Sequence, residues 1–468
     1  MGVPRSNGCL LCVQRRVKCD EKLPGCARCE TYGKPCPGYD RGFKFVVGKP
    51  YRSRRPPRST APELRGLSDD ASGSKSQYTT KDDSRAVVRR GNLSDLPSAH
   101  LQILQGLDIL VDDILQPFST SSAYTPSRWF QYLPSVYGKN KTLDCAIKCF
   151  SAHHIGTMTG NDRPVLYARR TYVEALNRLQ RSLCNKIESL SSEILCAVLL
   201  LCLYELFTNK NDSTSWMKHA KGLGQFIQIR GCHRYQDTFD HAMLHASRGI
   251  IVMHSVFANE RCFLNSDDWH FIMRNRPDTS LPANFFSLVE DMFAYLTAMP
   301  SLVHEFLRII KADPATPEAK LGRSKLLEQA LHMQQNLLVW YNTFTNTVPL
   351  PTETLSATGD TLHPIVYYFP NVDIATIYCA YYSYMALIHA ILQLCDYPGD
   401  HTAMVVYFRD QICKSVEYNS RGILGPYRLG FHLHVVYELG DPVTKAWVKS
   451  RLQDLSRNYA ALLPENFL

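Results

Sequence analysis

Apolar residues from Leu96 onward recur mainly at intervals of three or four positions, the period of a helix with one buried face. Tyr172, Leu176, Leu179 and Leu183 form one such stripe. Strand-like alternation is scarce. The pattern predicts helices at about 143–157, 164–184, 190–208, 213–230, 237–257, 284–310, 323–345, 371–395, 402–418 and 441–460. We therefore expect residues 96–468 to form a large all-α domain, as one continuous helical array.

The first apolar segment of this region has two interpretations. Leu96, Ile103, Leu107, Leu110 and Ile114 follow intervals of three, four and seven residues, which a dimerising coiled coil would also show. Further apolar residues between them make the face too broad for a narrow seam. A core helix is favoured, and a homodimer is not indicated by a clear coiled coil.

The segment before this region, residues 37–95, is mostly polar. Its first half is basic and rich in proline, and from about residue 59 it consists mainly of Ser, Asp, Lys, Arg and Gly, which predicts a disordered linker. Its basic residues suit a nuclear import signal or phosphate contacts, and a merely solvated linker is the alternative. They are Lys49, Arg52, Arg54, Arg55 and Arg58.

Charge is distributed very unevenly along the chain. The formal net charge is +9, yet residues 1–60 alone hold 14 Lys or Arg against 4 Asp or Glu, so the rest of the chain is close to neutral. Such a local excess is typical of a protein that touches a polyanion with one end only. The longest apolar run, 194–203, is too short to span a bilayer, so we expect a soluble protein with no membrane partner.

Six cysteines lie inside this basic end, in two copies of one pattern. Cys9, Cys12 and Cys19 form a CxxC pair followed by a third cysteine, and Cys26, Cys29 and Cys36 repeat it. Two CxxC pairs would close one tetrahedral zinc site and leave two thiols spare, whereas six thiolates can hold two zinc ions if two sulfurs bridge them. A disulfide framework would require a secretory context, and residues 1–20 show no apolar run behind a basic start.

This stretch resembles the fungal binuclear zinc cluster (six-cysteine, Gal4-like) transcription factors, whose cysteine spacing it matches without a gap. The resemblance implies two short helices and loops around two zinc ions, with all six cysteines as ligands, and a proline in the connecting loop, where Pro24 stands. It also implies that a basic cluster enters the major groove at CGG-type triplets. The position that usually contacts bases falls on Arg16, while Val13 replaces an arginine common in the family.

The DNA-binding residues expected from this resemblance and from the charge are Arg15, Arg16, Lys18, Lys22 and Arg28. Arginine is well suited to guanine and lysine to phosphate. Because fewer than about 40 residues cannot bury a sufficient core, the metal must stabilise this module. We expect residues 1–8 to form a flexible arm and 9–36 the module itself.

Three segments of the helical region resemble the fungal-specific transcription factor domain that often accompanies this cluster. They are 175–181, 194–207 and 216–222 leading to 229–231. No GxSxG, HExxH or Walker motif occurs, so no enzyme activity is expected. His241 and His245 have a metal-like spacing, but packing is the favoured interpretation. The ten remaining cysteines are interpreted as buried reduced thiols, and the dense Tyr and Phe residues as a filled core rather than a small-molecule pocket.

These observations jointly predict a nuclear, sequence-specific regulator of RNA polymerase II genes that binds double-stranded DNA. Transcription co-regulators and a small-molecule effector are the further candidate partners of the helical domain. The alternative is an adaptor with a single zinc ion that binds protein rather than DNA through the same module. An enzyme in the helical region with an accessory zinc module is a third hypothesis, without a motif behind it.

Overall fold

The computed structural model describes residues 9–20, 22, 25–37, 99–115, 128–185, 187–208, 215–275 and 283–456. The chain divides into two compact units, Met1–Gln102 and Ile103–Leu468, each with its own buried cluster. The first unit contains two short helices, α1 (Leu10–Gln14) and α2 (Ala27–Thr31). The second contains most of α3 (Ala99–Leu115) and every later described element.

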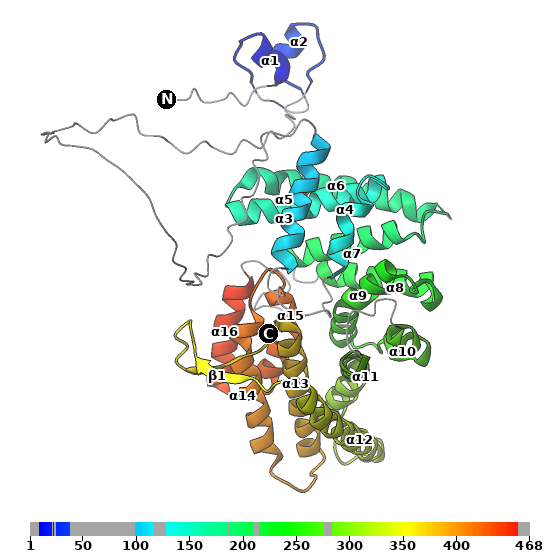
Figure 1. Ribbon diagram of the computed structural model, residues 1–468, viewed down its shortest axis with the longest axis vertical. Coiled ribbons are helices and arrows are strands. Elements are labelled where there is room, and N and C mark those ends of the chain that lie inside the picture. Colours follow the sequence, from blue (N-terminus) through cyan, green and yellow to red (C-terminus); the bar gives the residue numbers. More distant parts are fainter. Residues whose placement is uncertain are drawn as a thin grey trace, which may run out of the picture. The chain divides into compact units, whose positions relative to one another are not determined.

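The second unit is built almost entirely of helices in its described residues (Figure 1). After α3 they are α4 (Leu133–Val136), α5 (Lys141–Thr159), α6 (Asp162–Cys184), α7 (Ser192–Thr208), α8 (Ser215–Arg230), α9 (Thr238–Phe257), α10 (Asp267–Arg274), α11 (Ala283–Lys311), α12 (Pro317–Thr347), α13 (Val372–Leu394), α14 (His401–Asn419), α15 (Gly425–Glu438) and α16 (Pro442–Ser456). The same described ranges also hold the 3-10 turns η3 (Arg128–Tyr132), η4 (Cys232–Arg234) and η5 (Phe263–Asn265), and a hairpin of β1 (Thr352–Leu355) and β2 (Ile365–Tyr368).

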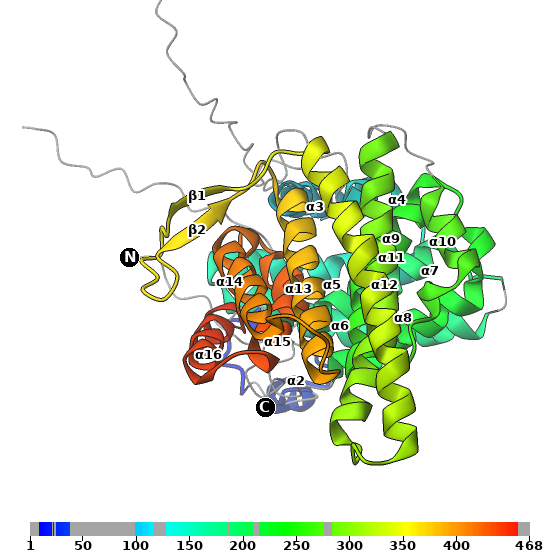
Figure 2. The same cartoon turned by 90° about the horizontal axis from the view of Figure 1, so that it is seen from below.

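Neighbouring helices along the chain pack against each other, as in α5 with α6, α7 with α8, and α13 with α14. Helices α9, α11, α13 and α15 also meet, which joins segments far apart in the sequence. Figure 2 shows α13 between α12 and α14. Helix starts are set locally: Asn140, Asp237 and Asn371 each accept hydrogen bonds from the first free N–H groups of the helix that follows.

Helix α13 is the most apolar long element of the unit apart from α7, and it is buried along nearly its whole length. It is the one helix among the described residues that is long and apolar enough to cross a membrane. However, 89% of its most apolar window is buried inside the unit, which is the usual position of a core helix. Its aromatic residues stack on neighbouring elements; Tyr381, for example, lies against Tyr341 with ring centroids 4.2 Å apart.

The predicted helical architecture is confirmed. Each of the ten helices expected between residues 143 and 460 is present, with bounds that mostly shift by one or two residues. Helix α12 begins earlier than expected because Thr316 caps it and Pro317 occupies its first turn. Helix α3 is a core helix, since Leu107, Leu110 and Ile114 are buried in the core of the second unit.

The elements not anticipated from the periodicity include helix α10, the β1–β2 hairpin and helix α15, besides short turns of helix. Helix α10 is too short for a repeating apolar face. The antiparallel hairpin pairs Thr352 with Tyr368 and Leu355 with Ile365, and β1 is exposed throughout, so no alternation marks it. Helix α15 begins at Gly425, where an added Cβ would overlap the backbone carbonyl of Ser420. A Gly-Pro start of this kind resembles a turn in the sequence.

Candidate metal centre and nucleic-acid interface

The metal-binding module consists of two equivalent halves, one from Cys9 to Cys19 and the other from Cys26 to Cys36. Cys9 precedes α1 and Cys26 precedes α2. The Cys9 sulfur accepts a hydrogen bond from the backbone N–H of Cys12 at 3.4 Å, and the Cys26 sulfur accepts the equivalent bond from Cys29 at 3.3 Å. Each CxxC pair thus places its first sulfur at the N-terminus of a short helix, where anions are stabilised.

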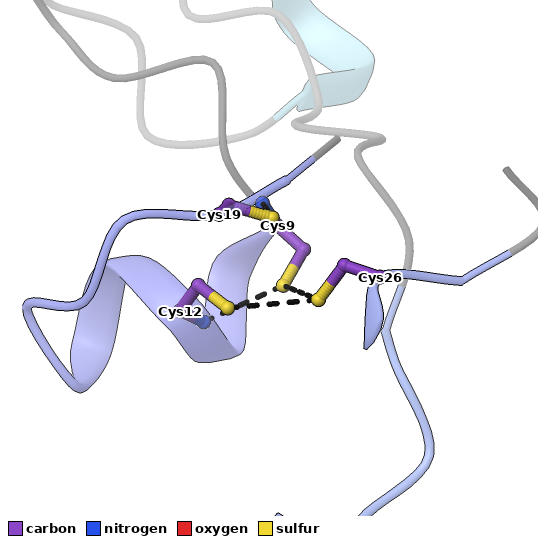
Figure 3. Close-up of side chains that lie close together, drawn as sticks. All are labelled: Cys9, Cys12, Cys19 and Cys26. Carbon is purple, nitrogen blue, oxygen red and sulfur yellow. Dashed lines mark hydrogen bonds between the residues drawn. The ribbon is translucent and has the colours of Figure 1, made fainter. Parts of the chain in front are cut away.

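The six sulfurs form two groups of four that share two members. Cys9, Cys12, Cys19 and Cys26 make one group, and Cys9, Cys26, Cys29 and Cys36 make the other. Within each group all sulfurs lie within 4.8 Å of one another. Figure 3 shows the first group, with sulfur separations of 3.7 Å between Cys9 and Cys26 and 3.6 Å between Cys12 and Cys26. Both match the edge of about 3.8 Å expected for a tetrahedron with Zn–S bonds of about 2.3 Å.

The electrostatics of these sulfurs require positive charge. Five of the six cysteines are buried and Cys36 is partly buried. Burial, reinforced by the neighbouring sulfurs of Cys9 and Cys26, raises the pKa of Cys12 to about 12. Burial also raises the pKa of Cys26 and Cys29. Crowded thiolates are therefore unfavourable as bare anions, and the donor set fits a pair of divalent, thiophilic cations such as zinc.

The basic residues of the module differ in their exposure to solvent. Arg16, Lys18, Lys22 and Arg28 are exposed. Arg15 instead is partly buried, with its guanidinium 3.4 Å from the centroid of the Tyr32 ring. This cation–π contact joins the end of α1 to the end of α2. Arg15 is therefore placed to hold the two halves together rather than to extend outward.

Arg16 has an unusual backbone conformation. Its φ angle is +55°, in the left-handed region that side chains with a Cβ rarely adopt. Gly33, at the equivalent position after α2, has a φ angle of +72°. The first half of the module thus places an arginine where the second half has the residue suited to this turn. Strain of about 1–2 kcal/mol at an exposed arginine is a feature often found at functional positions.

Sequence reasoning missed several supporting residues. Tyr32 was not singled out, although it occupies the place in the second half that Arg15 occupies in the first. Asp20 accepts a hydrogen bond from the N–H of Ala27 at 3.2 Å and so helps to start α2. The internal repeat was the signal for Tyr32, whereas nothing in the spacing indicated Asp20.

Several residues singled out in the sequence cannot be placed at the metal-binding module. The five basic linker residues from Lys49 to Arg58, the residues 1–8 and Pro24 fall outside the described residues. Val13 lies within α1. Among the residues that the structure describes, the two cysteine groups are the only clusters of three or more His, Cys, Asp or Glu side chains that could hold a metal.

Comparison with protein families identifies both units. Residues 7–44 match the fungal Zn(2)-Cys(6) binuclear cluster domain, and residues 108–400, more than half of the chain, match the fungal specific transcription factor domain. The chain belongs to the fungal specific transcription factor family. Its zinc cluster domain binds two zinc ions and precedes the transcription factor domain in the sequence.

Three relatives carry sequence similarity to parts of this chain. An uncharacterized protein, AN5342 of Emericella nidulans, is 24% identical over 40% of this chain and 41% of its own. The aspercryptin biosynthesis cluster-specific transcription regulator atnN of the same organism is 58% identical over 33 residues, or 7% of this chain and 5% of its own. An uncharacterized transcriptional regulatory protein, C965.10 of Schizosaccharomyces pombe, is 28% identical over 33% of this chain and 29% of its own. The chain thus spans less than half the length of each relative, and no solved structure matches it.

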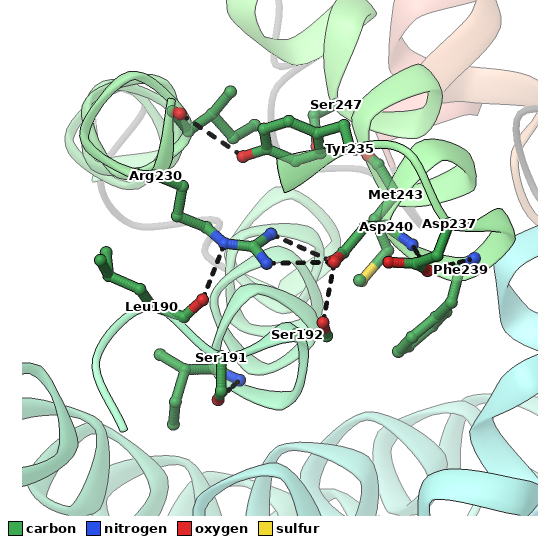
Figure 4. A network of polar contacts seen from close by, with 12 residues as sticks. Leu190, Ser191, Ser192, Arg230, Tyr235, Asp237, Phe239, Asp240, Met243 and Ser247 are labelled. Atoms are coloured by element: carbon green, nitrogen blue, oxygen red, sulfur yellow. Dashed lines mark hydrogen bonds and ion pairs between the residues drawn. The ribbon is translucent and has the colours of Figure 1, made fainter. Parts of the chain in front are cut away.

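In the transcription factor domain, the family-like segment that ends at Arg230 forms a buried clamp (Figure 4). The Arg230 guanidinium makes two hydrogen bonds to the Asp240 carboxylate, at 3.0 and 3.1 Å, and Nε donates to the carbonyl of Leu190. Ser192 donates to Asp240 at 2.8 Å. The clamp ties α8, α9 and the start of α7 together, so this segment is structural.

The two spaced histidines, and Trp216 and His219 of the family-like segment 216–222, also serve packing. Trp216 is buried edge-on against Phe257, and His219 lies 3.1 Å from the Tyr172 hydroxyl. His241 and His245 are both buried, and the Nε2 of His241 lies 3.3 Å from the Ile272 carbonyl. Most of the other ten cysteines are buried, as expected, but Cys184 is exposed and Cys232 and Cys395 are partly buried.

Proposed function

We propose that this regulator is a nuclear protein that binds CGG-type triplets in double-stranded DNA and controls genes transcribed by RNA polymerase II. The observation that carries the proposal is the set of exposed cations around the six-sulfur core, within the first 60 residues, which hold all of the chain's excess positive charge. Such a surface neutralises phosphates and contacts base edges. No enzyme activity is part of this function.

We assign the metal ligands from the sulfur geometry. Cys9, Cys12, Cys19 and Cys26 would hold one zinc ion, and Cys9, Cys26, Cys29 and Cys36 would hold the other. Cys9 and Cys26 belong to both groups and would serve both ions. These two sulfurs also accept the helix-start N–H bonds, so the same atoms set the helix starts and belong to both metal sites.

The base contact is assigned to Arg16. Its exposed side chain leaves the backbone at a left-handed turn, and arginine can donate two hydrogen bonds to one guanine. Lys18, Lys22 and Arg28 supply further contacts, chiefly to phosphates. Arg15 contributes through its stack on Tyr32, which holds the ends of the two helices in place. The basic linker adds phosphate contacts or a nuclear import signal.

An Arg16→Gly variant tests this assignment without endangering the fold, because glycine is suited to the left-handed turn that Arg16 occupies. We expect the variant to retain two zinc ions per chain. It should lose about 1–3 kcal/mol of preference for a CGG-containing duplex over a scrambled one, the usual value of a bidentate guanine contact. The measurement is fluorescence anisotropy with both duplexes at several salt concentrations, using the zinc-loaded full chain.

Lys34→Ala is the matched control, since it also removes one exposed positive charge from the module. It should weaken binding to both duplexes equally, as expected for loss of general electrostatic attraction. Unchanged CGG preference in the Arg16→Gly variant would contradict the assignment of Arg16. A wild-type protein without preference for CGG and with little salt dependence would instead favour the protein-binding adaptor.

A further inference from the structure

A cavity lies inside the second compact unit where α9, α11, α13 and α15 meet. Its volume is about 150 Å³, and most of its wall is apolar. The walls come from one face of each helix, for example Val252 on α9, Leu296 on α11, Ile377 on α13 and Phe431 on α15. Protein cores are normally filled to the density of organic crystals, so a space of this size is unusual. Apolar cavities of about this volume accept a molecule the size of benzene.

One hydroxyl in this wall has no hydrogen-bond partner among the described residues. Tyr384 lines the cavity from α13, its side chain is fully buried, and its hydroxyl is unpaired there. Leaving a buried hydroxyl unsatisfied costs about 1–3 kcal/mol. Two other polar groups of the wall are hydrogen-bonded: His432 contacts the Ser383 hydroxyl at 2.8 Å, and the Arg428 guanidinium donates to the Asn419 carbonyl.

A buried ion pair supports one residue of the wall. The Arg248 guanidinium lies 2.7 Å from the Glu290 carboxylate, and both residues are buried. The same guanidinium lies 3.6 Å from the centroid of the Phe293 ring, which forms part of the wall. This cation–π contact favours the observed position of the Phe293 ring, in which the cavity stays open.

We propose that this cavity is a binding site for a small aromatic or cyclic molecule with one hydroxyl or carbonyl oxygen, which hydrogen-bonds to the Tyr384 hydroxyl. The volume sets the size of the molecule, the apolar wall disfavours charged groups, and the unpaired hydroxyl sets the position of its oxygen. The site does not depend on the proposed DNA-binding function, since no residue of the zinc cluster takes part in it. Ligand binding between α9, α11, α13 and α15 would stabilise the packing of these four helices.

The test uses phenol and benzene as probes of the zinc-loaded full chain, with binding followed by titration calorimetry or ligand-observed NMR. Wild-type protein should bind one molecule of each probe. Tyr384→Phe removes only the hydroxyl and relieves an unsatisfied group, so this variant should fold at least as well as wild type. It should bind phenol roughly 3- to 10-fold more weakly, the range expected for one net hydrogen bond, and benzene within about twofold of wild type.

Ala380→Leu, which adds side-chain volume inside the cavity, should abolish binding of both probes. If this variant does not fold, the Tyr384→Phe comparison still decides the proposal. Absence of saturable binding to wild type would overturn it, and so would equal phenol affinity in wild type and Tyr384→Phe. Binding of the CGG duplex by the same preparations is measured separately, so a failure of DNA recognition is distinguishable from a failure of the cavity site.

Discussion

At the scale of single residues, the Arg230–Asp240 pair shows how burial decides the value of a charge contact. Arg230 and Asp240 are each 3% exposed and share two hydrogen bonds. Removing one partner from a buried pair leaves the other charge desolvated and uncompensated. The exposed pair of Arg178 and Glu174 on α6 also has a short contact, 2.9 Å, but solvent screens it. The two pairs have similar N–O distances, but removing one partner should cost much more unfolding free energy in the buried pair.

We therefore expect Asp240→Ala to lower the free energy of unfolding by about 3–5 kcal/mol, because it leaves Arg230 buried without its carboxylate. Glu174→Ala, the matched control, should lower it by about 0.3–0.5 kcal/mol. Urea unfolding followed by tryptophan fluorescence measures both. A loss below about 1 kcal/mol for Asp240→Ala would show that the clamp is dispensable.

The same scale shows what the sequence could and could not predict at the zinc cluster. The six cysteines were identified from spacing because a metal site constrains both residue type and separation. The stack of Arg15 on Tyr32 was not identified from the sequence, because it depends on how the ends of two separate helices approach each other. The conformation of Arg16 was equally hidden, because arginine gives no local signal for a left-handed turn.

At the scale of elements, the accuracy of a helix prediction depended on whether the residues at the start of the helix are typical of a helix cap. Long amphipathic helices with clear caps, such as α9 after Asp237, were predicted closely. Helix α15 was missed because its Gly-Pro start carries the composition of a turn. The structure shows that Gly425 is required for a close backbone approach rather than for flexibility. Sequence composition alone does not distinguish these two roles of glycine.

Two glycine substitutions should consequently have opposite effects. Gly425→Ala drives a Cβ into the Ser420 backbone carbonyl and should destabilise the domain by more than about 2 kcal/mol. Gly222→Ala, in the exposed part of α8, meets no atom within 4 Å and should stabilise the domain by about 0.5–1 kcal/mol. Thermal unfolding of the two variants beside wild type measures the signs. Equal effects would indicate that the turn before α15 relaxes freely.

At the scale of the whole molecule, positive charge and tryptophan are divided between the two ends of the chain. The range 1–60 holds all of the excess positive charge, and all five tryptophans lie at or beyond Trp129. This division could be predicted from the sequence, because the distribution of charge and of tryptophan along the chain does not depend on tertiary contacts. The cavity was not predicted from the sequence, because the dense aromatic residues around α13 indicated a filled core. A gap in packing depends on the shapes of four helices at once.

The distribution of tryptophan allows the stability of the helical domain to be followed alone as pH falls. Burial lowers the pKa of His241 and His389 to about 4 and that of His432 to about 3. In the unfolded chain these histidines titrate near 6.5, so between about pH 6.5 and 4 the unfolded state binds protons that the folded state does not. The free energy of unfolding should therefore decrease as pH is lowered through this window.

Urea titrations at pH 7.5, 6 and 5, followed by tryptophan fluorescence, measure this dependence. His432→Gln should remove part of the pH dependence, whereas His332→Gln, at a less buried position on α12, should leave it unchanged. A flat stability profile across this window would show that the buried histidines accept protons without unfolding.

The two halves of the zinc cluster repeat one cysteine spacing but differ in the residues that follow each helix. If both halves carried the same residues, the module would look the same after a half-turn, and it could sit on a duplex in either sense. Arg16 opposite Gly33, and Arg15 opposite Tyr32, remove that equivalence. The module is therefore asymmetric along its length. If it binds DNA as proposed, it would bind each triplet in one orientation only. Two triplets arranged head to head, tail to tail or in tandem would then be three different binding sites for this protein.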